Sequence, residues 1–187
     1  AITVEANFNH IESVQALFPQ IQHHFECVDI LINNAAIYLP GKGLETNQEA
    51  WQKQFQINLE TPFILTKAFA KQLPEGREGR VLNIADAQIL HHRPDHFAYR
   101  LTKLALVEMT RMFALERAPQ STLNALGPGI MLPLAGNENV DLQAYAKKYV
   151  PLNRTGSPEI AAENALRLIQ SDFITGTFLT LDGGQYL

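Results

Sequence analysis

A tyrosine and a lysine that could move a proton stand four residues apart, as Tyr99 and Lys103. In a helix this spacing places both side chains on one face. A phenol keeps its proton at neutral pH, and a neighbouring cation stabilises the phenolate and lowers the phenol pKa, so that donation becomes easier. Tyr-x-x-x-Lys is also a common accident on amphipathic helices, and the pair predicts a proton-donating centre only if other residues support it.

An aspartate supports this interpretation, because Asp86 follows a short apolar run and stands thirteen residues before Tyr99. A carboxyl group held near a phenol can help to route a proton to a reacting atom. The alternative is a carboxylate that caps a helix or lies on the surface after a strand.

The surrounding sequence predicts the elements that would position these residues. Four short apolar runs without polar alternation are typical of strands covered on both faces, at residues 28–32, 80–84, 121–126 and 177–181. Segments with helical period lie around residues 11–21, 51–70, 101–113 and 160–169. This alternation predicts an α/β fold, a doubly wound parallel sheet of the Rossmann type, whose ligands bind beyond the carboxyl ends of the strands. Residues 131–149 have weak periodicity and are predicted to form a mobile loop with a short helix.

Composition narrows the class of protein. The chain has 187 residues, of which 46% are hydrophobic and 18% are charged, and we expect residues 1–187 to form one domain. A formal charge of −4 and scattered Lys and Arg residues argue against nucleic acid as a partner. Residues 118–137 carry no charge, but prolines and polar side chains interrupt them, so we expect no membrane span. The single cysteine, Cys27, fits a reduced thiol and a cytoplasmic location.

Other kinds of site are not indicated. His91, His92 and His96 crowd the segment between Asp86 and Tyr99, but no cysteine or carboxylate spacing completes a zinc site, and we predict no metal. No Gly-x-Ser-x-Gly elbow and no Walker-type loop occur in the sequence. A solvated loop near the substrate is the simplest interpretation of the histidines.

Further motifs occur in a recognisable order along the chain. Asn33-Asn34-Ala35-Ala36 ends the first apolar run, Asn58 stands in a helical segment, Pro128-Gly129-Ile130 follows the third run, and Leu181-Asp182-Gly183-Gly184 ends the fourth. Together with Tyr99-x-x-x-Lys103 they resemble the short-chain dehydrogenase/reductase family over nearly the whole chain. Ala36 is a mild departure, because the family usually has glycine there.

The resemblance implies a role for each matching residue. The catalytic set is Asp86, Tyr99, Lys103 and Asn58, with Asn58 joining a water-mediated proton relay and Lys103 orienting the ribose of the cofactor. The cofactor-binding set is Asn7, Asn33, Asn34, Ala35, Ala36, Tyr99, Lys103, Pro128, Gly129 and Ile130. Within it, Asn7 stands where the family has an aspartate that contacts adenine, and the Pro-Gly turn holds the nicotinamide carboxamide.

One departure from the family bears on the substrate. Asp86 occupies the position of the usual catalytic serine, a change that resembles pteridine reductases and bacterial dihydromonapterin reductases. Tyr38 matches an aromatic residue that stacks on the pterin there, so the implied substrate-binding residues are Tyr38, Asp86 and Tyr99. The resemblance implies NADPH-dependent reduction of a pterin such as dihydrobiopterin or dihydromonapterin. The alternatives are reduction of a carbonyl in another small metabolite, with Asp86 a tolerated replacement, and a non-catalytic scaffold.

A second departure is the family's glycine-rich turn, which cradles the cofactor pyrophosphate and does not occur in this sequence. Residues 1–4 look like the family's third strand, and we expect the domain to be incomplete at its N-terminus. NADPH is therefore implied by the resemblance alone, and NADH is not excluded. The resemblance and the C-terminal tail also suggest a homotetramer.

Overall fold

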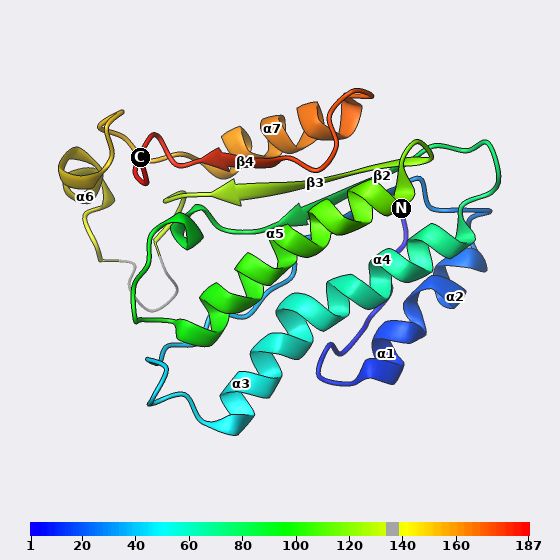
Figure 1. The fold of residues 1–187 in the computed structure, drawn as a ribbon, viewed down its shortest axis with the longest axis horizontal. Helices are drawn as coiled ribbons and strands as arrows, with labels where there is room; N and C mark the ends of the chain where they lie inside the picture. Colours follow the sequence, from blue (N-terminus) through cyan, green and yellow to red (C-terminus); the bar gives the residue numbers. More distant parts are fainter. Residues whose placement is uncertain (134–138) are drawn as a thin grey trace.

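In the computed structural model, which describes residues 1–133 and 139–187, parallel strands form one sheet in the order β1-β2-β3-β4 (Figure 1). The strands are β1 (Ile30–Asn33), β2 (Gly79–Ile84), β3 (Ser121–Pro128) and β4 (Phe178–Leu181). Each corresponds to one of the apolar runs, and these predictions are confirmed. Because the strands are parallel, their carboxyl ends share one edge of the sheet.

Helices cover both faces of this sheet, as expected of a doubly wound fold (Figure 1). The helical elements are α1 (Ile11–Gln15), α2 (Leu17–Gln22), α3 (Gln48–Phe55), the π-helical η1 (Gln56–Glu60), α4 (Thr61–Gln72), the 3₁₀-helical η2 (Ala87–Leu90), α5 (Phe97–Arg117), α6 (Leu142–Tyr149) and α7 (Pro158–Gln170). Helices α4 and α5 contact β2 on one face, and α7 contacts β2 and β3 on the other. The predicted Rossmann-type α/β fold is confirmed.

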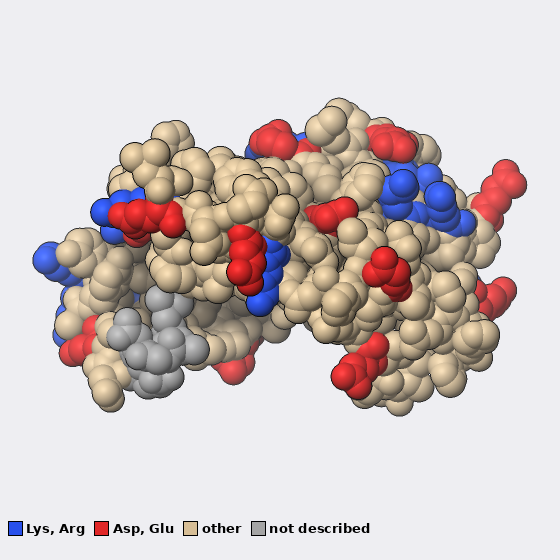
Figure 2. All heavy atoms as spheres, turned by 90° about the horizontal axis from the view of Figure 1, so that it is seen from below, with Lys and Arg blue, Asp and Glu red and all other residues tan. Residues whose placement is uncertain are grey.

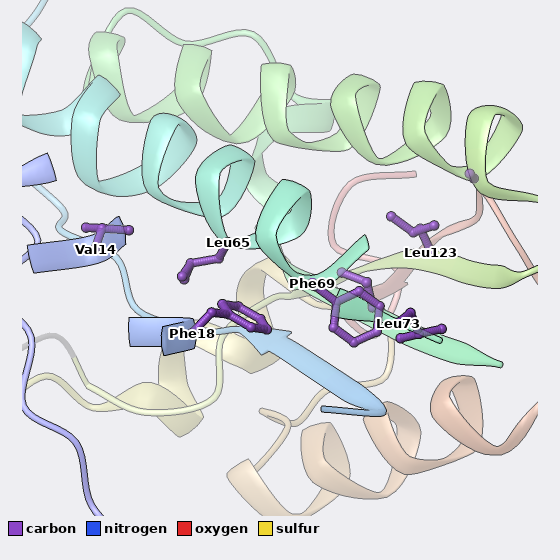
Figure 3. Close-up of a cluster of buried hydrophobic side chains, with 8 residues drawn as sticks. Val14, Phe18, Leu65, Phe69, Leu73 and Leu123 are labelled. Atoms are coloured by element: carbon purple, nitrogen blue, oxygen red, sulfur yellow. The ribbon is translucent and has the colours of Figure 1, made fainter. Parts of the chain in front are cut away.

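The larger core cluster lies between the sheet and helices α1, α2 and α4 (Figure 3). Its members are Val14, Phe18, Leu65, Phe69, Leu73, Val81, Ala114 and Leu123. Val81 of β2 belongs to this cluster, whereas the next residue, Leu82, packs with Leu168 of α7. Successive residues of a strand point to opposite faces, so a strand that is buried on both sides needs apolar residues throughout.

Prolines divide two of the predicted helical segments. Pro19 lacks the N–H that would bond to the Gln15 carbonyl four residues earlier, and the first segment is split into α1 and α2. Pro62 likewise has no N–H for the Asn58 carbonyl, and the second segment contains the π-helical turn η1 just before Pro62. The second segment is therefore not a continuous α-helix, because a π-helical turn that contains Asn58 separates α3 from α4.

The structure differs from expectation at the N-terminus. Residues 1–7 carry no strand assignment, so the interpretation of residues 1–4 as a strand is wrong for this structure. A strand requires ladder hydrogen bonds to a neighbour, and no described strand pairs with this segment. In residues 131–149, the predicted short helix is α6, whereas residues 134–138 lie outside the described residues.

Candidate active site

The predicted proton-donating residues come together at the carboxyl end of β2. Asp86 stands two residues beyond this strand, and Tyr99 and Lys103 lie in the first turns of α5. The Tyr99 hydroxyl donates a hydrogen bond to Asp86 Oδ2 at 2.8 Å, and Lys103 Nζ donates to the Ile84 carbonyl at 2.7 Å. Tyr99 and Lys103 are both buried. Asp86 also caps η2, so the capping role and the contact with Tyr99 coexist.

The electrostatics of Tyr99 differ from the expectation. Burial raises the pKa of the Tyr99 phenol, and the charge of Asp86 and the hydrogen bond to it act in the same direction. Lys103 does not offset this, because its ammonium nitrogen is bonded to Ile84 and lies 5.8 Å from the centre of the Tyr99 ring. Burial also lowers the pKa of Lys103 to about 8. The expected lowering of the Tyr99 pKa by Lys103 is therefore wrong for this structure, and the phenol holds its proton against Asp86.

Tyr38, the predicted stacking residue, lies directly against Tyr99. The two rings meet edge to face, with their centres 4.6 Å apart and an interplanar angle of 89°. The other neighbour of Tyr38 is His96, whose ring stacks on it at 4.0 Å and 11°. His96 precedes α5 and has a left-handed backbone, with φ of 50°. An aromatic wall thus stands beside the Asp86–Tyr99 pair.

The Asn58 side chain holds the segment that carries Tyr38. Its Oδ1 accepts from the Ile37 N–H at 2.8 Å, and its Nδ2 donates to the Ile37 carbonyl at 2.9 Å and to Thr102 Oγ1 at 3.3 Å. Asn58 is completely buried. Its backbone carbonyl lacks an α-helical partner, because Pro62 stands four residues later and has no N–H, so this carbonyl is the group suited to a relay water. The relay itself stays a prediction.

The predicted cofactor-binding residues near β1 divide into buried and exposed ones. Asn33 is buried and its Nδ2 donates to Asn83 Oδ1 at 2.7 Å, so its side chain serves the interior. Asn34, Ala35 and Ala36 are exposed at the carboxyl end of β1, where small side chains leave the backbone accessible. Asn7 is also exposed, and its Oδ1 accepts from Asn9 at the start of α1. No hydrogen bond among the described residues joins Asn7 to the Tyr99 region.

The predicted turn after β3 is fixed to the end of β4. The Gly129 N–H donates to the Leu181 carbonyl at 3.0 Å, and the Ile130 carbonyl accepts from Gly156 at 2.9 Å. A side chain at Gly129 would place its Cβ 2.7 Å from the Asp182 Cα, so only glycine fits. Pro128 is the last residue of β3 and pairs with Leu181. The turn therefore has a fixed position beside the candidate site.

Sequence comparison agrees with this arrangement. The sequence model of the family described as enoyl-(acyl carrier protein) reductase matches residues 1–185. The chain belongs to the short-chain dehydrogenase/reductase family. A 3-oxoacyl-[acyl-carrier-protein] reductase of Synechocystis is 30% identical over 100% of this chain and 76% of its own length. The protein is therefore an oxidoreductase of the short-chain dehydrogenase/reductase type.

Other members of the family differ in the substrates that their names state. An NAD-dependent glycerol dehydrogenase of Listeria innocua is 29% identical over 98% of this chain and 74% of its own length. The solved structure of FolM alternative dihydrofolate reductase 1 from Brucella canis, complexed with NADP, has a TM-score of 0.88 and 31% identity. The similarity covers 98% of this chain and 72% of that one. Membership of the family therefore indicates the class of reaction. The substrate has to be inferred from the residues of the site.

The structure adds residues that neither the spacing nor the family motifs indicated. Gln88 and Arg100 form a hydrogen-bonded network with Asp86, which is described below. Tyr186, near the C-terminus, is half-buried, and burial and the charge of Asp86 raise its pKa to about 12. Its ring centre lies 6.4 Å from that of His91. The only sequence signal for Arg100 is a charged residue that stands between Tyr99 and Leu101 in the predicted helix.

The surface of this protein carries scattered charge. On the face shown in Figure 2, small groups of acidic and basic side chains, some of them touching, are separated by uncharged areas. Within residues 1–133 and 139–187, no cluster of three or more His, Cys, Asp and Glu side chains could hold a metal ion. In the same ranges, no helix is both long and apolar enough to cross a membrane.

Proposed function

We propose that this protein is an NADPH-dependent reductase of a pterin, such as dihydrobiopterin or dihydromonapterin. The observation that carries the proposal is the hydrogen bond of 2.8 Å between Tyr99 and Asp86, with the Tyr38 ring 4.6 Å from the Tyr99 ring. A flat heteroaromatic substrate needs both an aromatic wall and a proton donor beside its ring nitrogens. A ketone needs a single donor at one oxygen and no aromatic neighbour.

The reaction adds a hydride to a ring carbon and a proton to the adjacent nitrogen, so that the dihydropterin, NADPH and a proton give the tetrahydropterin and NADP⁺. NADPH supplies the hydride when it is bound. The Tyr99 hydroxyl, held by its 2.8 Å bond to Asp86, supplies the proton, and a ring nitrogen seated against the pair receives it. Tyr38 excludes water from one side of the ring, and Lys103 supplies positive charge behind Tyr99.

Several features fit a nicotinamide dinucleotide in this position. The exposed small residues Ala35 and Ala36 leave room for a ligand at the carboxyl end of β1. The ammonium group of Lys103 has three N–H donors, and only one of them is bonded to the Ile84 carbonyl, so the others can bind a ligand. The NADP bound to the Brucella relative supports NADPH as the cofactor. NADH remains the alternative, and the ratio of kcat/KM values for the two cofactors decides between them.

A carbonyl reductase is the second candidate, and the Synechocystis relative favours it through its name and its 30% identity. In that case Tyr99 protonates a carbonyl oxygen, and Asp86 serves as the cap of η2. The two candidates predict different consequences of removing the Asp86 carboxyl group.

Steady-state oxidation of NADPH by the full-length protein tests these candidates. We expect dihydrobiopterin or dihydromonapterin to be reduced faster than a panel of ketones, and Asp86→Ala to lower kcat for the pterin by about a hundredfold or more. Asp141→Ala is the control, because Asp141 is the exposed cap of α6. Pterin turnover that Asp86→Ala leaves intact contradicts the proposal. Cofactor binding without any turnover indicates the non-catalytic scaffold.

We also propose that the protein assembles with copies of itself, as a homotetramer, and that helices α4 and α5 form one of the interfaces. A groove between these helices is lined mainly by apolar side chains, among them Phe63, Met109 and Met112. Lys67 and Glu108 also line it, so two copies related by a twofold axis could pair opposite charges. The single reduced cysteine supports a cytoplasmic location, which fractionation of cells would check.

A further inference from the structure

Gln88 holds the Asp86 carboxylate at both of its oxygens, one through its backbone N–H and the other through its side-chain amide. The backbone N–H of Gln88 donates to Asp86 Oδ1 at 2.8 Å, and its side-chain Nε2 donates to Asp86 Oδ2 at 2.8 Å. The Tyr99 hydroxyl donates to the same Oδ2. Rotation of the carboxylate about its χ2 torsion would break these bonds, so they hold the plane of the carboxylate in the orientation in which it meets Tyr99.

Arg100 determines the orientation of the Gln88 amide. The guanidinium Nη2 donates to Gln88 Oε1 at 3.0 Å. A guanidinium has donors and no acceptor, whereas a carboxylate has acceptors only. An amide placed between Arg100 and Asp86 must therefore turn its oxygen to Arg100 and its NH₂ group to Asp86. An amide orientation that is often ambiguous is fixed here by its two neighbours.

Arg100 is itself held firmly by the loop that it supports. It is 8% exposed, although arginine is rarely buried without partners. Its Nη1 donates to the carbonyls of Gln88 and His91 at 2.7 and 3.1 Å, and its Nε donates to the carbonyl of Asp95 at 2.9 Å. Asp95 adds an ion pair, with its Oδ1 3.3 Å from Arg100 Nη2. The guanidinium thus has little freedom to release the Gln88 side chain.

We propose that Gln88 and Arg100 are positioning residues of this reductase: Arg100 orients the Gln88 amide, and the amide fixes the Asp86 carboxylate against Tyr99. This inference rests on the proposed proton route through Asp86 and Tyr99.

A purely structural role makes a different prediction. The bonds from Arg100 to the carbonyls of Gln88, His91 and Asp95 are enough to fasten the loop to α5, and none of them involves the Gln88 amide. Loss of the amide would then leave catalysis unchanged. The Gln88 side chain is thus the group whose replacement separates positioning from loop stability.

The test compares Gln88→Met and Gln88→Glu in the full-length protein, with Gln52→Met, at an exposed position of α3, as the matched control. We expect Gln88→Met to lower kcat for the dihydropterin about tenfold, the effect of one lost hydrogen bond to a charged group, with KM for NADPH and the melting temperature within the range of the control. Gln88→Glu keeps the acceptor for Arg100 but places a carboxylate against Asp86. Like charges raise the apparent pKa of such a pair, so we expect the acid limb of the pH profile of kcat to move to higher pH.

A double-mutant cycle tests the order of action. If Arg100 acts through Gln88, the double variant Gln88→Met/Arg100→Met should have the same kcat as Arg100→Met alone. If the Arg100 variants do not fold, the two Gln88 variants carry the test by themselves. Wild-type kcat in Gln88→Met, or an unmoved acid limb in Gln88→Glu, overturns the positioning role. Failure of the wild-type protein to reduce any dihydropterin overturns the proposed function instead, and a ketone that it does reduce then serves as the substrate for the same variants.

Discussion

At the scale of single residues, the burial of Lys103 in the candidate site lowers the stability of the folded protein. Burial lowers its pKa from 10.5 to about 8, so in the folded protein the charged form is disfavoured. Between these two values the unfolded chain binds a proton that the folded protein does not, and the free energy of unfolding therefore rises with pH. Below about pH 8 the buried ammonium lowers stability by a constant amount, roughly 3 kcal/mol from the size of the shift.

The corresponding prediction concerns Lys103→Met. Methionine fills similar space without charge, but it leaves the Ile84 carbonyl without its donor, so we expect a net gain of about 1–2 kcal/mol at pH 7 and a loss of reductase activity. The gain should shrink as the pH rises from 8 to 10.5. Urea unfolding of both proteins across this range, without cofactor, measures it. A stability difference that stays the same at every pH would show that Lys103 titrates alike in both states.

The chemistry-bearing residues were predictable from the sequence to different degrees. Tyr99, Lys103 and Asp86 were predicted together and lie together, because spacing in a helix and position after a strand are readable properties. The direction of the Tyr99 pKa shift was not predictable. It depends on the burial of Tyr99 and on the bond of Lys103 to the Ile84 carbonyl, and neither can be inferred from the four-residue spacing of Tyr99 and Lys103. Gln88 was missed for the same reason, because nothing in the sequence tells where a loop side chain points.

At the scale of elements, η1 is the feature that links helix geometry to the site. Its Asn58 side chain satisfies both backbone groups of Ile37 and contacts Thr102 of α5. The next residue after Ile37 is Tyr38, so the Asn58 side chain of the π-helical turn positions the aromatic wall. Helical period predicted this helix but not its π-helical turn, which lies just before Pro62 and contains the buried Asn58.

Asn58→Ala tests this link. The change opens a gap at the fully buried Asn58 and leaves the partly buried N–H and carbonyl of Ile37 without partners, so we expect it to lower the free energy of unfolding by about 2–4 kcal/mol. Asn47→Ala, which removes the exposed cap of α3, should cost only about 1 kcal/mol. Urea denaturation followed by circular dichroism measures both. Equal losses in the two variants would mean that the Ile37 contacts are replaced by solvent and that η1 does not hold the Tyr38 segment.

At the scale of the whole molecule, the parallel sheet was predictable because both of its faces are apolar and helices alternate with strands. The strands lie side by side in the order in which they occur in the sequence, and this parallel order fixes the edge at which Asp86, Tyr99 and Gly129 meet. The exposed apolar residues on the outer faces of α4 and α5 were not predictable. Period places their apolar residues on the inner face, whereas Met112 of α5 is 70% exposed and still apolar.

The exposed apolar groove leads to the prediction for assembly. Met112→Glu places a charge where the groove would meet its twofold copy, and desolvating an unpaired carboxylate costs several kcal/mol, enough to dissociate an interface of ordinary size. We expect light scattering after gel filtration to give a multiple of the chain mass for the wild-type protein and a smaller species for Met112→Glu. Leu44→Glu, at a fully exposed position outside the groove, should keep the wild-type mass. A wild-type monomer would contradict the proposed assembly. An unchanged mass in Met112→Glu would place the interface elsewhere, because a carboxylate buried without a partner at this contact would weaken the association.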